Sequence, residues 1–176
     1  MPVLAALTVS VGLLAVVATW LFGLDPLATG NLQVWQAFIA WGCHFHSGGK
    51  WGGSRTTILC MSFGAIVGMV SVMLAGNLAA LGSLAAPVAV GIGASVIVLA
   101  SSVPYLGVIP ASVYGFASIA GLILLKPGMT PQAAIVPTIL SIVIGAVFGY
   151  VSEALANALA KKGEPSAEAE ALHAAK

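Results

Sequence analysis

Long apolar runs, separated by short stretches rich in charges, prolines or glycines, extend over almost the whole chain. A transmembrane helix needs about 20 consecutive apolar residues, and runs of roughly that length recur here. The first run has no basic segment before it and no small-residue cleavage motif after it, so we expect it to be retained as a helix. The pattern predicts six membrane-spanning helices, at about 3–23, 31–46, 56–76, 84–103, 111–125 and 132–157.

The charged residues lie almost entirely between or after these runs. Of the 176 residues, 60% are hydrophobic and 6% are charged, whereas soluble domains carry about 25% charged residues. Residues 56–103 contain no Asp, Glu, Lys or Arg, as expected where a charge at a helix centre costs about 2.5–3.5 kcal/mol. Most of the surface must therefore face lipid, and a net charge of +1 gives no reason to expect nucleic acid as a partner.

Basic residues predict the orientation, because short loops rich in Lys and Arg stay on the cytoplasmic side. Two basic pairs stand out: Lys50 with Arg55, and Lys161 with Lys162. Four predicted helices separate the pairs, so both pairs and both termini lie on the cytoplasmic side. A transmembrane domain at 1–160 is then followed by a polar cytoplasmic tail at 161–176. If the run at 31–46 only dips into the membrane and returns, the N-terminus moves to the other side.

An internal repeat organises the runs into two halves. Residues 57–71 and 138–152 are identical at eight of 15 positions, at an offset of 81. Weaker matches at offsets of 80 and 79 extend the likeness, including Val34 and Trp35 with Val113 and Tyr114. The halves, about 1–80 and 81–160, would each hold three helices.

This repeat has a consequence for symmetry. Three crossings are an odd number, so the second half begins on the opposite face of the membrane. Inverted repeats of this kind recur in transporters and bring equivalent elements together near the bilayer midplane. The predicted fold is therefore an all-α membrane protein of six transmembrane helices, arranged as two inverted three-helix repeats. The alternative is that the duplication only produced a stable bundle.

Both copies of the repeat carry a small-x-x-x-small motif, which allows helix backbones to approach closely in lipid. The motifs are Gly64 with Gly68, and Gly145 with Gly149. We interpret these glycines as packing residues and expect the third and sixth helices to cross on these faces or to pack between protomers. A homo-oligomer is therefore expected.

The run at 31–46 is unusually rich in polar and aromatic side chains for a membrane span. Its candidate pore or substrate-binding residues are Trp35, Gln36, Phe38, Trp41, His44 and His46. Buried amides and imidazoles need partners, so they tend to face the bundle interior or water. The histidines would suit a pH-sensitive gate near the cytoplasmic mouth. The alternative is an interfacial aromatic belt with merely solvated histidines.

A second candidate region follows the fourth run, where two prolines and a glycine interrupt the helix. Its candidate residues are Pro104, Tyr105, Pro110, Ser112, Tyr114 and Phe116. Irregular backbone at membrane depth is tolerated where it is buried in protein or lines a cavity. In an inverted repeat the aromatic residues would oppose Trp35 and Phe38 and form a constriction. The alternative is a short interfacial loop.

Several chemistries are disfavoured. Cys43, His44 and His46 offer metal-ligand types, but their spacing on a helix does not converge on one point, so no metal is expected. The glycine-rich loop at 47–53 lacks the spacing of a phosphate-binding loop, and no cofactor is implied. No nucleophile–base pair is evident in the sequence, so we do not expect an enzyme.

The sequence resembles the YcdZ-like family of small bacterial inner-membrane proteins, which is defined by a domain of unknown function. The resemblance covers about residues 5–155 and is carried by several short motifs. They are Trp35-x-x-Phe38 into Trp41, Gly48-Gly49-Lys50, Val103-Pro104, Pro110-x-x-x-Tyr114-Gly115-Phe116-Ala117, and Gly145-x-x-x-Gly149-Tyr150. It implies a multi-pass protein of the bacterial inner membrane with about six spans. It brings no established substrate and no catalytic residues.

These features favour a channel or facilitator that passes a small neutral or weakly polar solute. No predicted span carries a central acidic residue, which argues against coupling to protons or sodium ions. The lipid bilayer, further copies of the chain and a small solute are the expected partners. The alternative function is a non-transporting scaffold or a subunit of a larger membrane complex.

Overall fold

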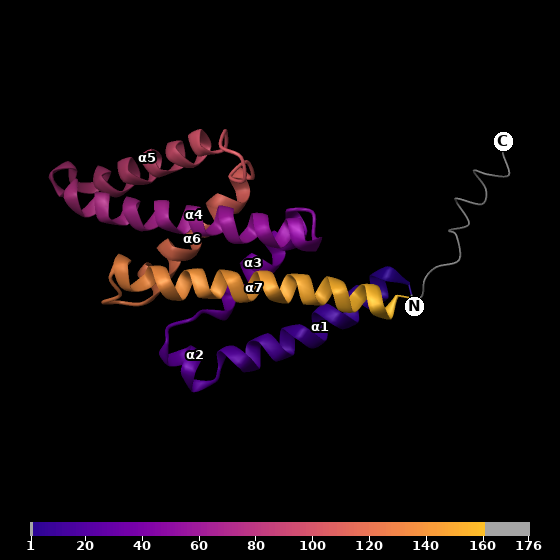
Figure 1. Cartoon of the computed structure of the whole chain (residues 1–176). Coiled ribbons are helices and arrows are strands. Elements are labelled where there is room, and N and C mark those ends of the chain that lie inside the picture. Colours follow the sequence, from indigo (N-terminus) through magenta and orange to yellow (C-terminus); the bar gives the residue numbers. More distant parts are fainter. Residues whose placement is uncertain (1, 161–176) are drawn as a thin grey trace, which may run out of the picture.

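Seven α-helices and one short 3₁₀ helix make up most of residues 2–160, the part of the chain described by the structure, a computed structural model (Figure 1). The elements are α1 (Val3–Phe22), α2 (Asp25–Thr29), α3 (Val34–His46), α4 (Lys50–Asn77), η1 (Ala79–Leu84), α5 (Ala85–Ala100), α6 (Ile109–Leu125) and α7 (Pro131–Leu159). These residues contain no β-strand, so the all-α prediction is confirmed for them. The predicted tail at 161–176 lies outside the described residues.

By length and composition, the helices are those of a multi-pass membrane protein. Four segments are long and apolar enough to cross a bilayer: Val3–Phe22, Lys50–Asn77, Ala79–Ala100 and Pro131–Leu159. The second and fifth predicted spans correspond to α3 and α6, which have only 13 and 17 residues. At a rise of 1.5 Å per residue they are about 20 and 26 Å long, short of the ~30 Å hydrocarbon core. Six crossings therefore stay a prediction.

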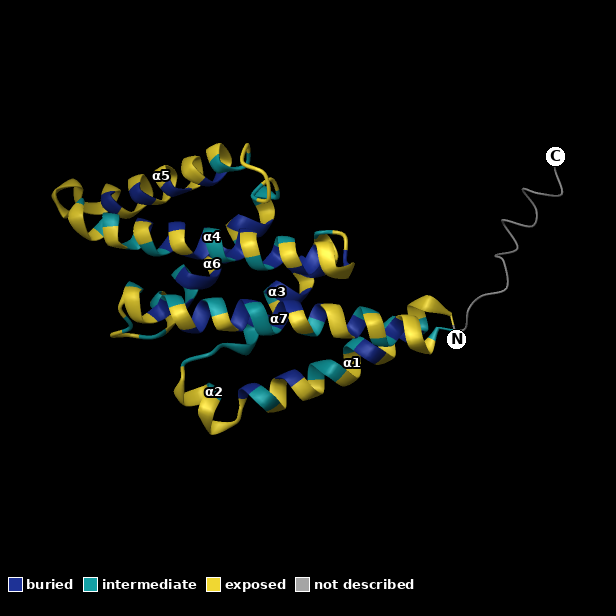
Figure 2. Ribbon diagram, viewed as in Figure 1, coloured by how far each residue is buried: buried dark blue, intermediate teal, exposed yellow. Residues whose placement is uncertain are grey.

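The long helices α4 and α7 lie side by side at the centre, and the short helices α3 and α6 pack between them (Figure 1). α6 packs mainly against α4, and α3 mainly against α7. The outer helices α5 and α1 lie against α4 and α7 respectively. These two outer helices bury few residues and expose apolar side chains, as helices that face lipid should (Figure 2).

The connections gather at two ends of the molecule (Figure 1). One end, called here the Lys50 end, contains the starts of α1 and α4, the α5–α6 link and the end of α7. The other end, called the Lys126 end, contains α2, η1 and the α6–α7 link. Hydrogen bonds agree with this arrangement, because Lys50 contacts Glu153 at one end and Lys126 contacts Asn31 at the other. The side of the membrane on which each end lies stays a prediction.

A tight turn joins α3 to α4 and explains part of the glycine-rich loop. Gly48, Gly49 and Lys50 have φ values of 93°, 66° and 54°, in the left-handed region that favours glycine. A Cβ at Gly49 would lie 2.9 Å from Glu153 Oε2, and one at Gly53 would lie 2.6 Å from the His44 carbonyl oxygen. The turn lets α4 begin at Lys50, about two turns earlier than the sequence predicted.

The glycine motifs are packing residues, but the predicted crossing of the third and sixth helices on these faces is wrong. A Cβ at Gly64 would lie 1.8 Å from the Ser112 carbonyl oxygen, and one at Gly145 would lie 2.1 Å from that of Ala37. The glycine faces of α4 and α7 therefore contact α6 and α3, because the short helices occupy the space between the long ones. These contacts lie within one chain.

Candidate functional site

Polar side chains are buried where the helices of the bundle pack against one another. The buried polar residues are Ser10, Gln36, His44, Ser54, Thr57, Ser71, Ser112, Ser118, Thr138, Ser141 and Ser152. In an interior without water, each such group costs free energy unless it finds a hydrogen-bond partner. The partners define a central amide site around Gln36 and a cluster around His44 nearer the Lys50 end.

The central amide site joins three helices. Gln36 of α3 is fully buried, and its Nε2 donates to the Ser118 carbonyl oxygen of α6 at 2.9 Å and to Thr138 Oγ1 of α7 at 3.1 Å. Its carbonyl oxygen, Oε1, has no hydrogen-bond partner within residues 2–160. The same holds for Thr57 Oγ1 on α4. An unpaired buried acceptor costs about 1–3 kcal/mol, so Oε1 would gain from a ligand or water that donates.

Non-helical backbone segments extend from both ends of the molecule toward the level of the central amide site. The Gln33 N–H, just before α3, donates to Ser141 Oγ of α7 at 3.0 Å. In the segment before α6, the Tyr105 carbonyl oxygen accepts a hydrogen bond from Cys60 Sγ of α4 at 3.2 Å. Ser141 and Cys60 each lie about ten residues into their helices, roughly 15 Å along the axis. Both short helices are therefore preceded by non-helical segments that are bonded to the inside of the bundle.

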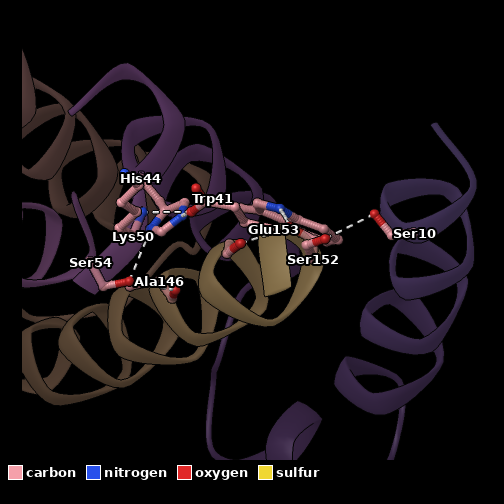
Figure 3. Close-up of polar contacts among 9 residues, drawn as sticks. Ser10, Trp41, His44, Lys50, Ser54, Ala146, Ser152 and Glu153 are labelled. Carbon is pink, nitrogen blue, oxygen red and sulfur yellow. Dashed lines mark hydrogen bonds and ion pairs between the residues drawn. The ribbon is translucent and has the colours of Figure 1, made fainter. Parts of the chain in front are cut away.

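The cluster around His44 connects α3, α4 and α7 (Figure 3). His44 Nδ1 lies 2.9 Å from Ser54 Oγ, and Nε2 lies 3.1 Å from Glu153 Oε2. A carboxylate only accepts, so Nε2 donates to Glu153, and the single proton of the Ser54 hydroxyl is shared between Nδ1 and the Ala146 carbonyl oxygen. The Lys50 backbone N–H donates to the same carboxylate oxygen, Oε2. His44 is fully buried, whereas the Glu153 side chain is 22% exposed.

Serine, histidine and glutamate in a row resemble a hydrolase triad, but the surroundings of Ser54 do not support that role. Ser54 is 3% exposed, and its hydroxyl lies between His44 and the Ala146 carbonyl oxygen at 3.4 Å. Neither Ser54 nor His44 lines the cavity that Glu153 borders. The contacts instead hold three helices together at the Lys50 end.

Trp41 extends the polar contacts to α1. Its Nε1 donates to Ser152 Oγ at 2.9 Å, and Ser10 Oγ donates to the Ser152 carbonyl oxygen at 2.9 Å (Figure 3). The Trp41 ring is buried and stacks on Phe38 and Phe148. α1 is thus attached to α7 through a buried serine pair.

The candidates at 31–46 separate into two groups. Gln36, Trp41 and His44 are buried on one side of α3 and take part in the contacts above. Phe38 and His46 are exposed, and Trp35 is half-buried against Gly121. The structure therefore brings three of these candidates into buried contacts and leaves the other three outside them, and a role in lining a solute path stays a prediction.

The candidates at 104–116 are also dispersed, and the predicted aromatic constriction is not present. Pro104, Tyr105 and Pro110 are exposed, while Ser112 is buried where α6 meets Gly64. Tyr114 and Phe116 are half-buried, and the Tyr114 ring lies 6.0 Å from that of His46. Because α3 and α6 are antiparallel, Tyr114 meets the end of α3, far from Trp35 at its start.

Sequence reasoning missed the residues that hold the polar candidates in place. Glu153, Ser54, Thr138 and Ser152 lie on α4 and α7, whose apolar character concealed them. For Thr138 and Ser152 the available signal was their recurrence in the repeat, as Thr57 and Ser71, whereas Ser54 and Glu153 have no counterpart of the same type at the offset of 81. Within residues 2–160, no three His, Cys, Asp or Glu side chains gather as metal ligands.

Several cavities border the described helices, among them a wide one of about 550 Å³ along α1 at Ala15, Val16, Thr19 and Trp20. Two apolar ones, of about 190 and 220 Å³, lie between α5 and α6 and where these helices meet α4. Another, of about 200 Å³, lies at the Lys50 end. Its lining residues are Lys50, Trp51, Tyr150, Glu153, Ala154 and Asn157.

The comparisons with known proteins identify a family but no activity. A family model described as "Protein of unknown function (DUF1097)" matches residues 8–157, and the chain belongs to this family. No curated protein and no solved structure matches the chain. The match agrees with the predicted extent of a domain of unknown function, whereas the YcdZ-like naming and a bacterial inner-membrane location stay predictions.

Proposed function

We propose that this member of a family without assigned activity is a six-span membrane protein of two inverted halves that passes a small neutral or weakly polar solute. α1, α3 and α4 form the first half, and α5, α6 and α7 form the second. The bacterial inner membrane, with both termini cytoplasmic, is its proposed location. We propose no enzymatic activity.

The helix contacts support the inverted halves. Exchanging α1 with α5, α3 with α6 and α4 with α7 converts the α3–α7 contact into the α6–α4 contact. The same exchange converts the α1–α7 contact into the α5–α4 contact, and all four contacts are present. A two-fold axis between α4 and α7 would produce this pattern.

Individual residues support the same axis at the offset of 81. Gly64 meets the backbone of α6, as Gly145 meets that of α3. Cys60 and Ser141 also correspond at this offset, and each binds the irregular segment that leads into a short helix. In a six-span arrangement these segments complete the crossings for which α3 and α6 alone are too short.

The unpaired Oε1 of Gln36 is the observation that carries the transport proposal. It is a fully buried acceptor where α3, α6 and α7 meet, and a solute with an N–H or O–H group would satisfy it. Within residues 2–160 the only carboxylates are Asp25 and Glu153, which lie at opposite ends. A charged solute would thus find no counter-ion at this level, which favours neutral or weakly polar solutes.

Solute flux into proteoliposomes tests this proposal, with a panel of small amides, alcohols, weak acids and ammonium compounds. The Gln36→Leu variant roughly keeps the side-chain volume but removes the acceptor, together with the bonds that Nε2 donates to Ser118 and Thr138. It should lower flux about tenfold, equivalent to about 1.4 kcal/mol. Ser95→Ala is the matched control, because Ser95 is exposed on α5 and should leave flux unchanged. Folding of each variant is checked by circular dichroism. Absence of flux for every solute with folded protein would contradict the proposal.

A non-transporting subunit of a larger membrane complex is the second candidate function. The contacts at Gly64, Gly115 and Gly145 favour it, because added Cβ atoms there would lie within 2.1 Å of the neighbouring backbone. Such packing leaves little room for a path between α4 and α6 or between α7 and α3. This function predicts no flux together with a stoichiometric partner that stays bound through purification in mild detergent. The mass of the purified assembly also tests the proposed homo-oligomer.

A further inference from the structure

A small cavity at the Lys50 end has a lining that the proposed solute path does not use. It encloses about 200 Å³ between the start of α4 and the end of α7. Lys50 and Trp51 line it from α4, and Tyr150, Glu153 and Asn157 line it from α7. The residues that line the cavity thus carry a carboxylate, an ammonium group and two aromatic rings.

The carboxylate is held firmly, yet only one of its oxygens is used. Oε2 accepts from His44 Nε2 and from the Lys50 backbone N–H. Oε1 has no hydrogen-bond partner within residues 2–160, and the side chain remains 22% exposed. The two bonds at Oε2 satisfy the donors of α3 and α4, which are His44 Nε2 and the Lys50 N–H. If Glu153 had only a structural role, Oε1 would be left to bind water. A fixed carboxylate oxygen beside a cavity is also an acceptor for a cationic donor.

No cation of the described chain fills this position. Within residues 2–160 the only ion-pair contact of Glu153 is with His44, which is charged only when protonated. Lys50 is a lining residue of the same cavity, and its ammonium group makes no ion pair with Glu153. A ligand that carries both signs would complement both groups, with its positive end at Glu153 and its negative end at Lys50.

The aromatic residues indicate where the cavity lies relative to the membrane. Trp51 is 69% exposed and Tyr150 is 45% exposed, and their rings meet edge to face with centroids 6.5 Å apart. Trp51 lies in the first turn of α4, and Trp and Tyr are enriched near the ends of membrane helices, at the level of the lipid head groups. Indole and phenol faces also attract organic cations.

We propose that this cavity binds a primary ammonium group, and that its source is the head group of an aminophospholipid. The ammonium donates to Glu153 Oε1 beside the Trp51 and Tyr150 rings, and the adjoining phosphate pairs with Lys50. A primary ammonium has three N–H donors, whereas a quaternary ammonium has none, so the site discriminates between ethanolamine and choline head groups. This proposal does not depend on solute transport.

Titration calorimetry of the full chain in detergent micelles tests the proposal. The probes are short-chain phosphatidylethanolamine, phosphatidylcholine and phosphatidylglycerol with identical acyl chains, and free ethanolamine. Phosphatidylethanolamine should bind at least about tenfold more tightly than the other two lipids, because they lose a charge-assisted hydrogen bond. Free ethanolamine should bind more weakly still, since it lacks the phosphate and the acyl chains. If ethanolamine binds as tightly as the lipid, the ligand is a soluble amine and the lipid assignment is overturned.

Variants locate the binding in this cavity. Glu153→Gln should weaken the binding of phosphatidylethanolamine about tenfold, but this variant also disturbs the contact with His44. Asn157→Leu and Trp51→Ala alter the cavity without touching the bonds at Oε2, and each should weaken binding severalfold. Trp20→Ala is the control, because Trp20 is an equally exposed tryptophan at the other end of the molecule. Equal binding of all three lipids, or binding unaffected by all of the cavity variants, would overturn the proposal.

Discussion

Glu153 acts as a helix cap supplied from another helix. Gly49, the residue before α4, has no side chain to cap the free backbone N–H groups of the first turn. Glu153 of α7 instead accepts from the Lys50 N–H and adds a negative charge at the positive end of the α4 dipole. The absence of a Cβ at Gly49 lets the carboxylate approach, so the glycine and the glutamate depend on each other.

This capping predicts a loss of stability in Glu153→Gln. The amide still accepts a hydrogen bond but lacks the charge, so the free energy of unfolding should fall by about 1.5 kcal/mol. Unfolding in mixed micelles with increasing dodecyl sulfate measures this change. The control is Asp25→Asn at the exposed start of α2, which should have little effect. Equal stability of Glu153→Gln and the native chain would contradict the capping role.

Single residues were predictable from the sequence where their own type was unusual. Gln36, Trp41 and His44 stood out as polar or aromatic groups in an apolar run, and all three are buried in specific contacts. Their partners were not predictable, because Glu153 follows His44 by 109 residues on a helix of ordinary apolar composition. One partner of Gln36 is a backbone carbonyl, at Ser118, which no side-chain pattern reveals.

At the scale of elements, backbone contact at glycines determines how the helices pack. Lipid offers no hydrophobic drive for helix association, so close van der Waals packing must supply the stabilisation. α4 meets α6 at Gly64 and Gly115, and α7 meets α3 at Gly145. The short helices are held between the long ones by these contacts.

The glycine contacts predict that Gly64→Ala and Gly145→Ala are severely destabilising. The added methyl group would overlap neighbouring backbone, which cannot rotate away, so each should lower the free energy of unfolding by at least about 3 kcal/mol. Gly91→Ala provides the control, because a Cβ there has nothing within 4 Å. It lies in the interior of α5, where alanine should be neutral or stabilise by up to about 1 kcal/mol. Similar stabilities of all three variants in dodecyl sulfate unfolding would contradict this account.

Helix positions were largely predictable, whereas the boundaries of α4 and the partners of the glycine faces were not. Apolar length alone located each run, because membrane helices must satisfy their backbone groups internally. The sequence predicts that α4 starts at about 56, because the glycine-rich stretch before it is typical of a loop. Glu153 and the turn at Gly49 stabilise an earlier start, at Lys50. The residues around Lys50 do not predict this start, because Glu153 lies 103 residues further along the chain.

For the whole molecule, the decisive question is whether α3 carries the chain across the bilayer. α3 and the segment before it connect α2, at the Lys126 end, to the start of α4, at the Lys50 end (Figure 1). If α3 crosses, three passages separate α2 from the α5–α6 link. If α3 does not cross, only two passages separate them, and α2 and the α5–α6 link lie on the same side of the membrane.

Cysteine labelling in oriented membrane vesicles distinguishes these cases. Ala28→Cys in α2 and Ser102→Cys in the α5–α6 link are both at exposed positions. A membrane-impermeant maleimide should reach them from opposite sides, and the native Cys43 and Cys60 should stay unlabelled because both are buried. Labelling of both engineered cysteines from the same side would exclude a crossing by α3.

The glycine contacts of α4 and α7 also reveal how far the two halves have diverged. A Cβ at Gly149 would touch the imidazole of His44, whereas one at Gly68 would touch the aliphatic Ile119. Ser152 is bonded to Trp41, while its counterpart Ser71 lies close to Gly93. Under the proposed duplication, one copy has kept or gained polar side chains where the other is apolar. The two faces of an otherwise symmetric scaffold thereby differ, and under the proposed transport a solute bound inside it would meet unequal barriers toward its two exits.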